Sequence, residues 1–75
     1  MAYEVHVRWD GDAMVWYVDE TNVPGLTGEA ETIEAMLTKL DVLVPEMLEE
    51  NGIAHAESVP FELLAHRNAV ANHRT

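Results

Sequence analysis

The sequence predicts an α+β domain with the element order β-β-β-α-β, in which one helix covers one face of a four-stranded sheet. Three observations support this prediction. Residues 32–51 repeat apolar side chains at intervals of three and four, which is typical of a helix with one buried face. Residues 3–9 and 14–20 alternate apolar and polar side chains on either side of a turn, as in a β-hairpin. Residues 59–67 alternate in the same way and predict a last strand.

The segment Asp10-Gly11-Asp12-Ala13 indicates a turn between the first two strands. Its two aspartates also suit a hard cation, but the calcium-loop pattern does not continue, so we interpret them as turn residues. A hairpin closed over Gly11-Asp12 places six apolar side chains on one face, which favours that register. The predicted pairs are Trp9 with Met14, Val7 with Trp16, and Val5 with Val18. The opposite face then carries Glu4, His6, Arg8, Val15, Tyr17 and Asp19.

The positions of the third and fourth strands in the sheet are predicted from the segments that precede them. Pro24-Gly25 has the residues of a type II turn. The short strand that follows, residues 26–30, contains Gly28 and is expected at a sheet edge. The helix then crosses the sheet and returns the chain parallel to an earlier strand, and the right-handed crossover rule favours the first strand as its neighbour. The predicted spatial order is therefore 3-2-1-4.

Both ends of the helix are marked in the sequence. Thr32 is a favourable N-cap residue, and Asn51-Gly52 tolerates the left-handed conformation with which helices commonly end. Pro45 removes one backbone hydrogen bond from the interior, so we expect a single bent helix with this proline on the solvent side. The predicted buried face consists of Ile33, Met36, Leu37, Leu40, Leu43, Val44, Met47 and Leu48.

Length and composition restrict the class of protein. Seventy-five residues form one domain, which we expect to span residues 1–75 with a short tail at 67–75. The net charge of −10, from 14 acidic residues against 4 Lys and Arg, argues against direct nucleic-acid binding, because phosphate contacts need clustered cations. The chain has no cysteine, no membrane-span pattern and no signal-peptide pattern, so we expect a cytoplasmic protein that does not bind membranes. A domain this small is marginally stable alone, which favours self-association.

Motifs for catalysis or cofactor binding are absent from the sequence. There is no phosphate-binding loop, no dinucleotide-binding glycine pattern and no nucleophile elbow, so we expect neither an enzyme nor a cofactor. The four histidines lack a metal-ligand spacing, so we expect no metal site. His6 and His66 can approach one another if the first and last strands are neighbours. We favour surface imidazoles over a two-histidine ribonuclease site, because the sequence lacks basic residues to hold RNA phosphates.

Several short motifs occur in an order that resembles a known family. They are Trp9-Asp10, Val15-Trp16, Val23-Pro24-Gly25-Leu26, Glu29-Ala30-Glu31-Thr32, Pro45-Glu46-Met47-Leu48, Asn51-Gly52 and Pro60-Phe61-Glu62-Leu63. Together they resemble the HicB-like antitoxin superfamily over nearly the whole chain, and most closely an uncharacterised bacterial domain of unknown function within it. The resemblance implies a partial ribonuclease-H-like fold with the same β-β-β-α-β order.

The resemblance also implies a role. HicB-type antitoxins bind and neutralise HicA-type toxins, which are small basic proteins that cleave mRNA. An acidic domain is suited to cover such a basic surface, so we expect an antitoxin-like, non-enzymatic protein-interaction module. Only eight residues follow Arg67, too few for a C-terminal DNA-binding domain, and we therefore expect no operator binding. The candidate partner contacts, chosen by position and charge, are Asp19, Glu20, Glu29 and Glu31.

An alternative role is a homo-oligomer, such as a homodimer, without a toxin partner. The small size, the edge strand at residues 59–67 and the apolar side chains on the uncovered sheet face favour it. The candidate self-association residues are Val15, Tyr17 and Leu64.

Overall fold

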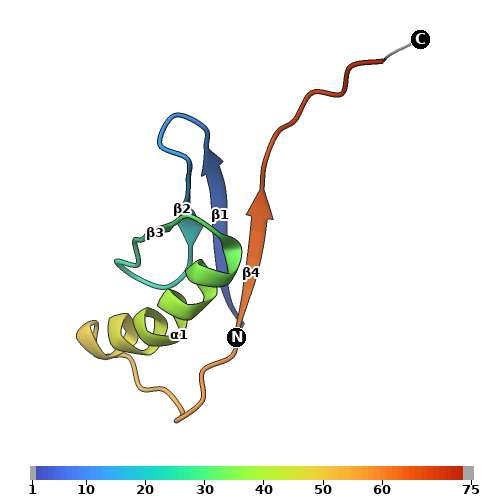
Figure 1. Ribbon diagram of the computed structural model, residues 1–75. Helices are drawn as coiled ribbons and strands as arrows, with labels where there is room; N and C mark the ends of the chain where they lie inside the picture. Colours follow the sequence, from blue (N-terminus) through green and yellow to red (C-terminus); the bar gives the residue numbers. More distant parts are fainter. Residues whose placement is uncertain (1, 74–75) are drawn as a thin grey trace.

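A computed structural model describes residues 2–73 as one sheet with one helix (Figure 1). The sheet contains β1 (Tyr3–Asp10), β2 (Val15–Thr21), β3 (Glu29–Ala30) and β4 (Phe61–His66), and the helix α1 spans Ile33–Glu50. The strand order is β3-β2-β1-β4, with β1 antiparallel to β2 and parallel to β4. The predicted element order and the predicted strand order are therefore confirmed.

The helix begins and ends at its predicted capping residues. Thr32 is the N-cap, and its hydroxyl accepts a hydrogen bond from the backbone N–H of Ala35 at 3.0 Å. Asn51 is the C-cap, and Gly52 follows it with a φ of 68°. Pro45 lies inside one continuous helix, as predicted, although it is half-buried instead of fully on the solvent side.

The hydrophobic core lies between α1 and one face of the sheet. Four helix residues at intervals of four are completely buried, and they pack in one cluster with the two central valines of β1. Leu37, which was predicted for the buried face, is 39% exposed, so that prediction was wrong for this residue. The buried side chains are all apolar: Val5, Val7, Val23, Leu26, Ala30, Met36, Leu40, Val44 and Leu48.

The connection between β2 and β3 contributes two residues to this core: Val23, which was predicted to lie in a loop, and Leu26, which was predicted to begin the third strand. Val23 and Leu26 are both buried, and the N–H of Leu26 donates to the carbonyl of Val23. Gly25 lies between them with a φ of 73°, as the predicted type II turn requires. The strand β3 consists of the pair Glu29–Ala30 alone and is shorter than the predicted strand at 26–30.

The turn between β1 and β2 is longer than predicted. The Asp10 carboxylate accepts hydrogen bonds from the backbone N–H groups of Asp12 and Ala13, and the N–H of Met14 donates to the Asp10 carbonyl. These bonds close a four-residue turn instead of a two-residue turn. Met14 lies in this turn with a φ of 59° and is 62% exposed, so the prediction that it faces Trp9 was wrong.

The longer turn shifts the strand register by two residues. Because side chains alternate with a period of two, a shift of two leaves the same valines and tryptophans on the helix side of the sheet. A β-bulge then adds one residue to β2, and Asp19 and Glu20 are both exposed there. The observed pairs are Trp9–Trp16, Val7–Val18 and Val5–Thr21, in place of the predicted Trp9–Met14, Val7–Trp16 and Val5–Val18.

Beyond β4 the chain leaves the body of the domain. Residues 67–73 of the predicted tail have no secondary structure and extend away from the sheet (Figure 1). Met1, Arg74 and Thr75, which belong to the predicted domain and tail, lie outside the described residues. Among residues 2–73, no helix has the length and apolar character needed to cross a membrane.

Candidate protein-interaction surface

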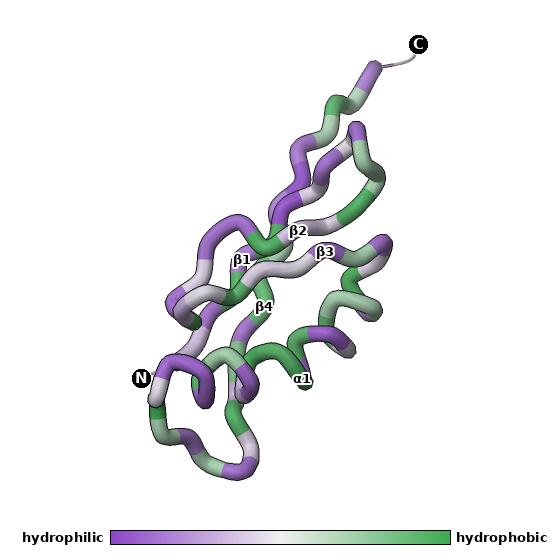
Figure 2. Tube along the Cα trace, turned by 90° about the vertical axis from the view of Figure 1, so that its left-hand side faces the viewer, coloured by the Kyte–Doolittle hydropathy of each residue, from purple (hydrophilic) through white to green (hydrophobic). Residues whose placement is uncertain are grey.

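The helix covers only one face of the sheet. Figure 2, which is turned by 90° from Figure 1, shows α1 on one side of the strands. Side chains alternate along a strand, so those between the core positions point to the opposite side, which we call the open face. The open face consists of Glu4, His6 and Arg8 of β1, Val15, Tyr17, Asp19 and Glu20 of β2, Glu29 of β3, and Glu62, Leu64 and His66 of β4.

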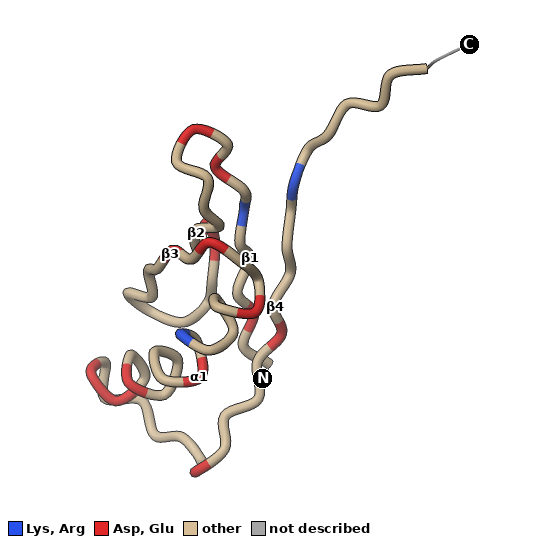
Figure 3. The backbone as a smooth tube through the Cα atoms, in the orientation of Figure 1, with Lys and Arg blue, Asp and Glu red and all other residues tan. Residues whose placement is uncertain are grey.

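Carboxylates dominate the charge of the open face. Five of its side chains are acidic, and each belongs to an exposed residue: Glu4, Asp19, Glu20, Glu29 and Glu62. Its one arginine, Arg8, donates from Nε to the Asp19 carboxylate at 3.2 Å. Figure 3 shows the same imbalance along the whole trace, where acidic residues far outnumber basic ones. The open face therefore presents a negative surface.

The basic residues that the structure describes are already engaged. Arg8 is paired with Asp19, and the Lys39 ammonium donates to the backbone carbonyl of Glu29. The Arg67 guanidinium lies 4.4 Å from the centroid of the Trp9 ring. Within residues 2–73 these are the three Lys and Arg residues, and each already has a partner, so few cations remain for phosphate contacts.

The four predicted partner contacts lie along the β2–β3 half of the sheet. Asp19 and Glu20 are adjacent at the bulge of β2, and Glu29 pairs with Tyr17 across the strands. Glu31 follows directly after β3, where the chain turns into the helix. All four of these residues are exposed.

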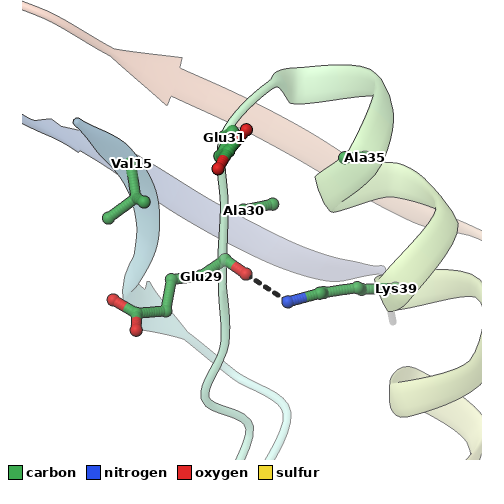
Figure 4. A pocket seen from close by; sticks show the side chains of 6 residues that line it. All are labelled: Val15, Glu29, Ala30, Glu31, Ala35 and Lys39. Carbon is green, nitrogen blue, oxygen red and sulfur yellow. Dashed lines mark hydrogen bonds between the residues drawn. The ribbon is translucent and has the colours of Figure 1, made fainter. Parts of the chain in front are cut away.

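A shallow pocket of about 340 Å³ lies beside β3 (Figure 4). Figure 4 shows the Glu29 carboxylate pointing away from the helix, while Lys39 reaches the Glu29 backbone from the helix side. The carboxylate is therefore free to contact a partner while the backbone is held in place. The lining residues are Val15, Glu29, Ala30, Glu31, Ala35 and Lys39.

The predicted self-association residues lie on the same face but not together. Val15, Tyr17 and Leu64 are all half-buried. Tyr17 pairs with Arg8, and Leu64 pairs with His6, so the polar side chains of β1 separate the apolar residues of β2 from that of β4. These residues therefore do not form one continuous apolar patch, because polar side chains lie between them.

The parallel pairing of β1 and β4 brings two histidines together. His6 Nδ1 and His66 Nε2 are 3.0 Å apart, and the two ring planes are parallel within 4°. The second ring nitrogen of His6, Nε2, lies 3.8 Å from the Glu4 carboxylate. The prediction that these histidines approach one another, if the first and last strands are neighbours, is confirmed.

A third histidine is held elsewhere, next to the end of α1. His55 Nδ1 lies 2.8 Å from the Ala56 carbonyl, and Nε2 lies 3.1 Å from Glu49 Oε1. The hydrogen bond to Ala56, together with the hydrogen bond and charge of Glu49, raises the pKa of His55 above its usual 6.5. Only a protonated imidazole donates from both nitrogens, so these contacts favour the charged form.

These features define a small acidic α+β protein with one open sheet face. The chain belongs to the family described as Domain of unknown function (DUF1902), which matches residues 2–73. This confirms the part of the predicted resemblance that concerned a domain of unknown function. The chain is also similar to the crystal structure of a hypothetical protein from the extremely thermophilic bacterium Thermus thermophilus, with 46% identity, a TM-score of 0.79, and coverage of 95% of this chain and 100% of that chain. No curated protein matches the chain.

Proposed function

We propose that this protein is a non-enzymatic protein-interaction module whose open face binds a basic partner. The observation that supports this proposal is the gathering of five exposed carboxylates on one face of the sheet, around half-buried Tyr17 and Leu64. Complementary charge accelerates encounter and selects partners of opposite sign, while apolar side chains between the charges supply contact area. The proposed contacts are Asp19, Glu20 and Glu29 of the open face, together with Glu31, which directly follows β3.

The partner class that we propose is a HicA-type toxin. The proposal rests on the ordered motifs that resemble the HicB-like antitoxin superfamily, and the strand order β3-β2-β1-β4 with one helix is consistent with a partial ribonuclease-H-like fold. A toxin of this type is small and basic because it binds mRNA. An acidic domain that covers the basic surface excludes the RNA phosphates from it, which is neutralisation by competition in the cytoplasm.

Titration calorimetry with a small basic protein encoded beside this chain tests the proposal. The double variant Glu20→Lys/Glu29→Lys changes the net charge by four units on the open face. The matched control, Glu46→Lys/Glu50→Lys, makes the same change at exposed positions of α1. We expect the open-face variant to bind at least about tenfold more weakly, and the control variant to differ less than threefold from the native chain.

Three results would contradict this proposal. Absence of binding at low micromolar concentration would remove the toxin as partner. Equal weakening by both double variants would show that net charge, and not the open face, determines the binding. A toxin that still cleaves mRNA when saturated with this protein would separate binding from neutralisation and argue against the antitoxin role.

The alternative function is a homo-oligomer without a toxin. The observation that favours it is the position of β4 at an edge of the sheet, next to β1 alone. The unpaired backbone groups of such an edge can pair with a second copy of the chain and extend the sheet. Light scattering at about 100 µM protein distinguishes the two functions, because a monomer mass at this concentration argues against stable self-association.

A further inference from the structure

We propose that His6 and His66 form a binding site for a divalent late transition-metal ion, such as Zn²⁺ or Ni²⁺. Imidazole nitrogens are preferred ligands of these ions. The two side chains project from adjacent strands, and their nearest nitrogens are 3.0 Å apart. The His6 side chain is 27% exposed, so an ion can reach it from solvent while the strands hold it in place. This site does not depend on the identity of any protein partner.

The separation of the two nitrogens fits a shared metal ion. Metal–nitrogen bonds of about 2.0–2.1 Å, at angles between about 90° and 109°, place two ligating nitrogens roughly 2.9–3.4 Å apart. The observed separation of 3.0 Å lies within that range, and it is the length of a hydrogen bond between two parallel rings, in which one of the two nitrogens carries the proton. A metal ion takes the place of that proton, which is released to solvent, and both rings turn so that their lone pairs point to the ion instead of to one another.

Glu4 lies beside the nitrogen of His6 that does not face His66. Its carboxylate is 3.8 Å from His6 Nε2, beyond hydrogen-bond distance, whereas Nδ1 is the nitrogen that faces His66. In protein metal sites a carboxylate commonly stands beside the non-ligating nitrogen of a histidine ligand.

The charge around the pair also favours a cation. Glu20 pairs with His6 across β2, and Glu62 pairs with Glu4 across β4, so carboxylates flank the histidines. The positive charge of Arg8 is offset by its ion pair with Asp19. Within residues 2–73 no group of three or more His, Cys, Asp or Glu residues is arranged to hold a metal. The pair is therefore a two-ligand site, and water completes the coordination.

Calorimetry and NMR on the untagged, full-length chain test this site. We expect His6→Gln and His66→Gln each to weaken binding of Zn²⁺ and of Ni²⁺ at least tenfold, because one remaining imidazole is a much weaker ligand. His55→Gln and His73→Gln are matched controls with the same substitution, and we expect both to stay within twofold of the native chain. In NMR spectra of the native chain, Zn²⁺ should shift the ring signals of His6 and His66 before those of the other histidines.

The opposite results would overturn the proposal. If native protein showed no binding of either ion below about 100 µM, the pair would not be a metal site. Equal losses in His6→Gln and His55→Gln would indicate scattered binding to single histidines. Competition by Mg²⁺ at equal concentration would assign the affinity to the carboxylates, because Mg²⁺ prefers oxygen ligands. The NMR experiment uses the native chain, so its result does not depend on the folding of any variant.

Discussion

Truncation of Leu40 to alanine tests the packing of the helix on the sheet. Leu40 is completely buried at the middle of α1, in one cluster with Val5 and Val7. Removing a buried leucine side chain in this way costs about 2–5 kcal/mol. At roughly 0.05–0.15 kcal/mol per residue, the whole chain is stable by about 4–11 kcal/mol. We therefore expect Leu40→Ala to remove about a fifth or more of the free energy of unfolding, and to lower the melting temperature by about 8–40 °C. The stronger change Leu40→Asp should prevent folding, because it buries a charge.

Leu37→Ala is the matched control, because it makes the same substitution one turn earlier on the same helix. Leu37 is 39% exposed, so we expect a loss below about 1 kcal/mol. Urea denaturation followed by circular dichroism and by the fluorescence of Trp9 and Trp16 measures both values. Equal losses for the two variants, with unchanged m-values, would show that the helix presents a different side to the sheet and would refute the reasoning.

Three further predictions concern a turn, a cap and a histidine. In denaturation experiments, Gly25→Ala should lower the free energy of unfolding by about 1–2 kcal/mol, because φ is 73° and the added Cβ would lie 2.9 Å from Met47 Cε. The control is Gly52→Ala, where φ is 68° and no atom lies close to the added Cβ, so this variant measures the cost of the backbone conformation alone. Thr32→Ala should cost about 1 kcal/mol by the same method, since it removes the N-cap hydrogen bond. His55→Gln should change the dependence of stability on pH. The folded state binds the His55 proton more tightly than the unfolded state. The free energy of unfolding of the native chain should therefore exceed that of the variant most below about pH 6.5, and this difference should disappear as the pH rises through the raised pKa.

The helix was predictable because its signals are local and agree with one another. The cap at Thr32 and the end at Asn51 follow from neighbouring residues, and both are confirmed. The width of the buried face was overestimated. A sheet touches a helix along a narrow line, so the residues at intervals of four are fully buried, while Leu37 on the margin remains exposed.

The register of the hairpin could not be predicted from the sequence. The face of each strand follows from alternation and was predicted correctly, but the register depends on the length of the turn. Gly11-Asp12 suggested a two-residue turn, whereas the Asp10 carboxylate binds two backbone N–H groups and stabilises a four-residue turn. The burial of Val23 was missed for a similar reason, because a loop residue has no periodic pattern that predicts its burial.

The candidate surface was predictable in part. The residues of the open face follow from strand alternation, and the approach of His6 to His66 follows from the strand order, although sixty positions separate the two residues in the chain. A search for metal ligands by sequence spacing overlooks such a pair, because the ligands lie on different strands. The separation of Tyr17 from Leu64 by the polar side chains of β1 could be recognised only from the observed register of the strands.

The proposed metal site and the proposed partner surface share the open face, so the two binding events must influence one another. A divalent ion at His6 and His66 adds two positive charges close to Glu4 and Glu20, and it lowers the attraction of this face for a basic protein. By thermodynamic linkage, the partner then weakens the binding of the ion by the same factor. Titration of the basic partner with and without saturating Zn²⁺ measures this factor. We expect weaker partner binding with Zn²⁺ in the native chain and no effect of Zn²⁺ in His66→Gln, whereas equal effects in both chains would place the ion outside the histidine pair.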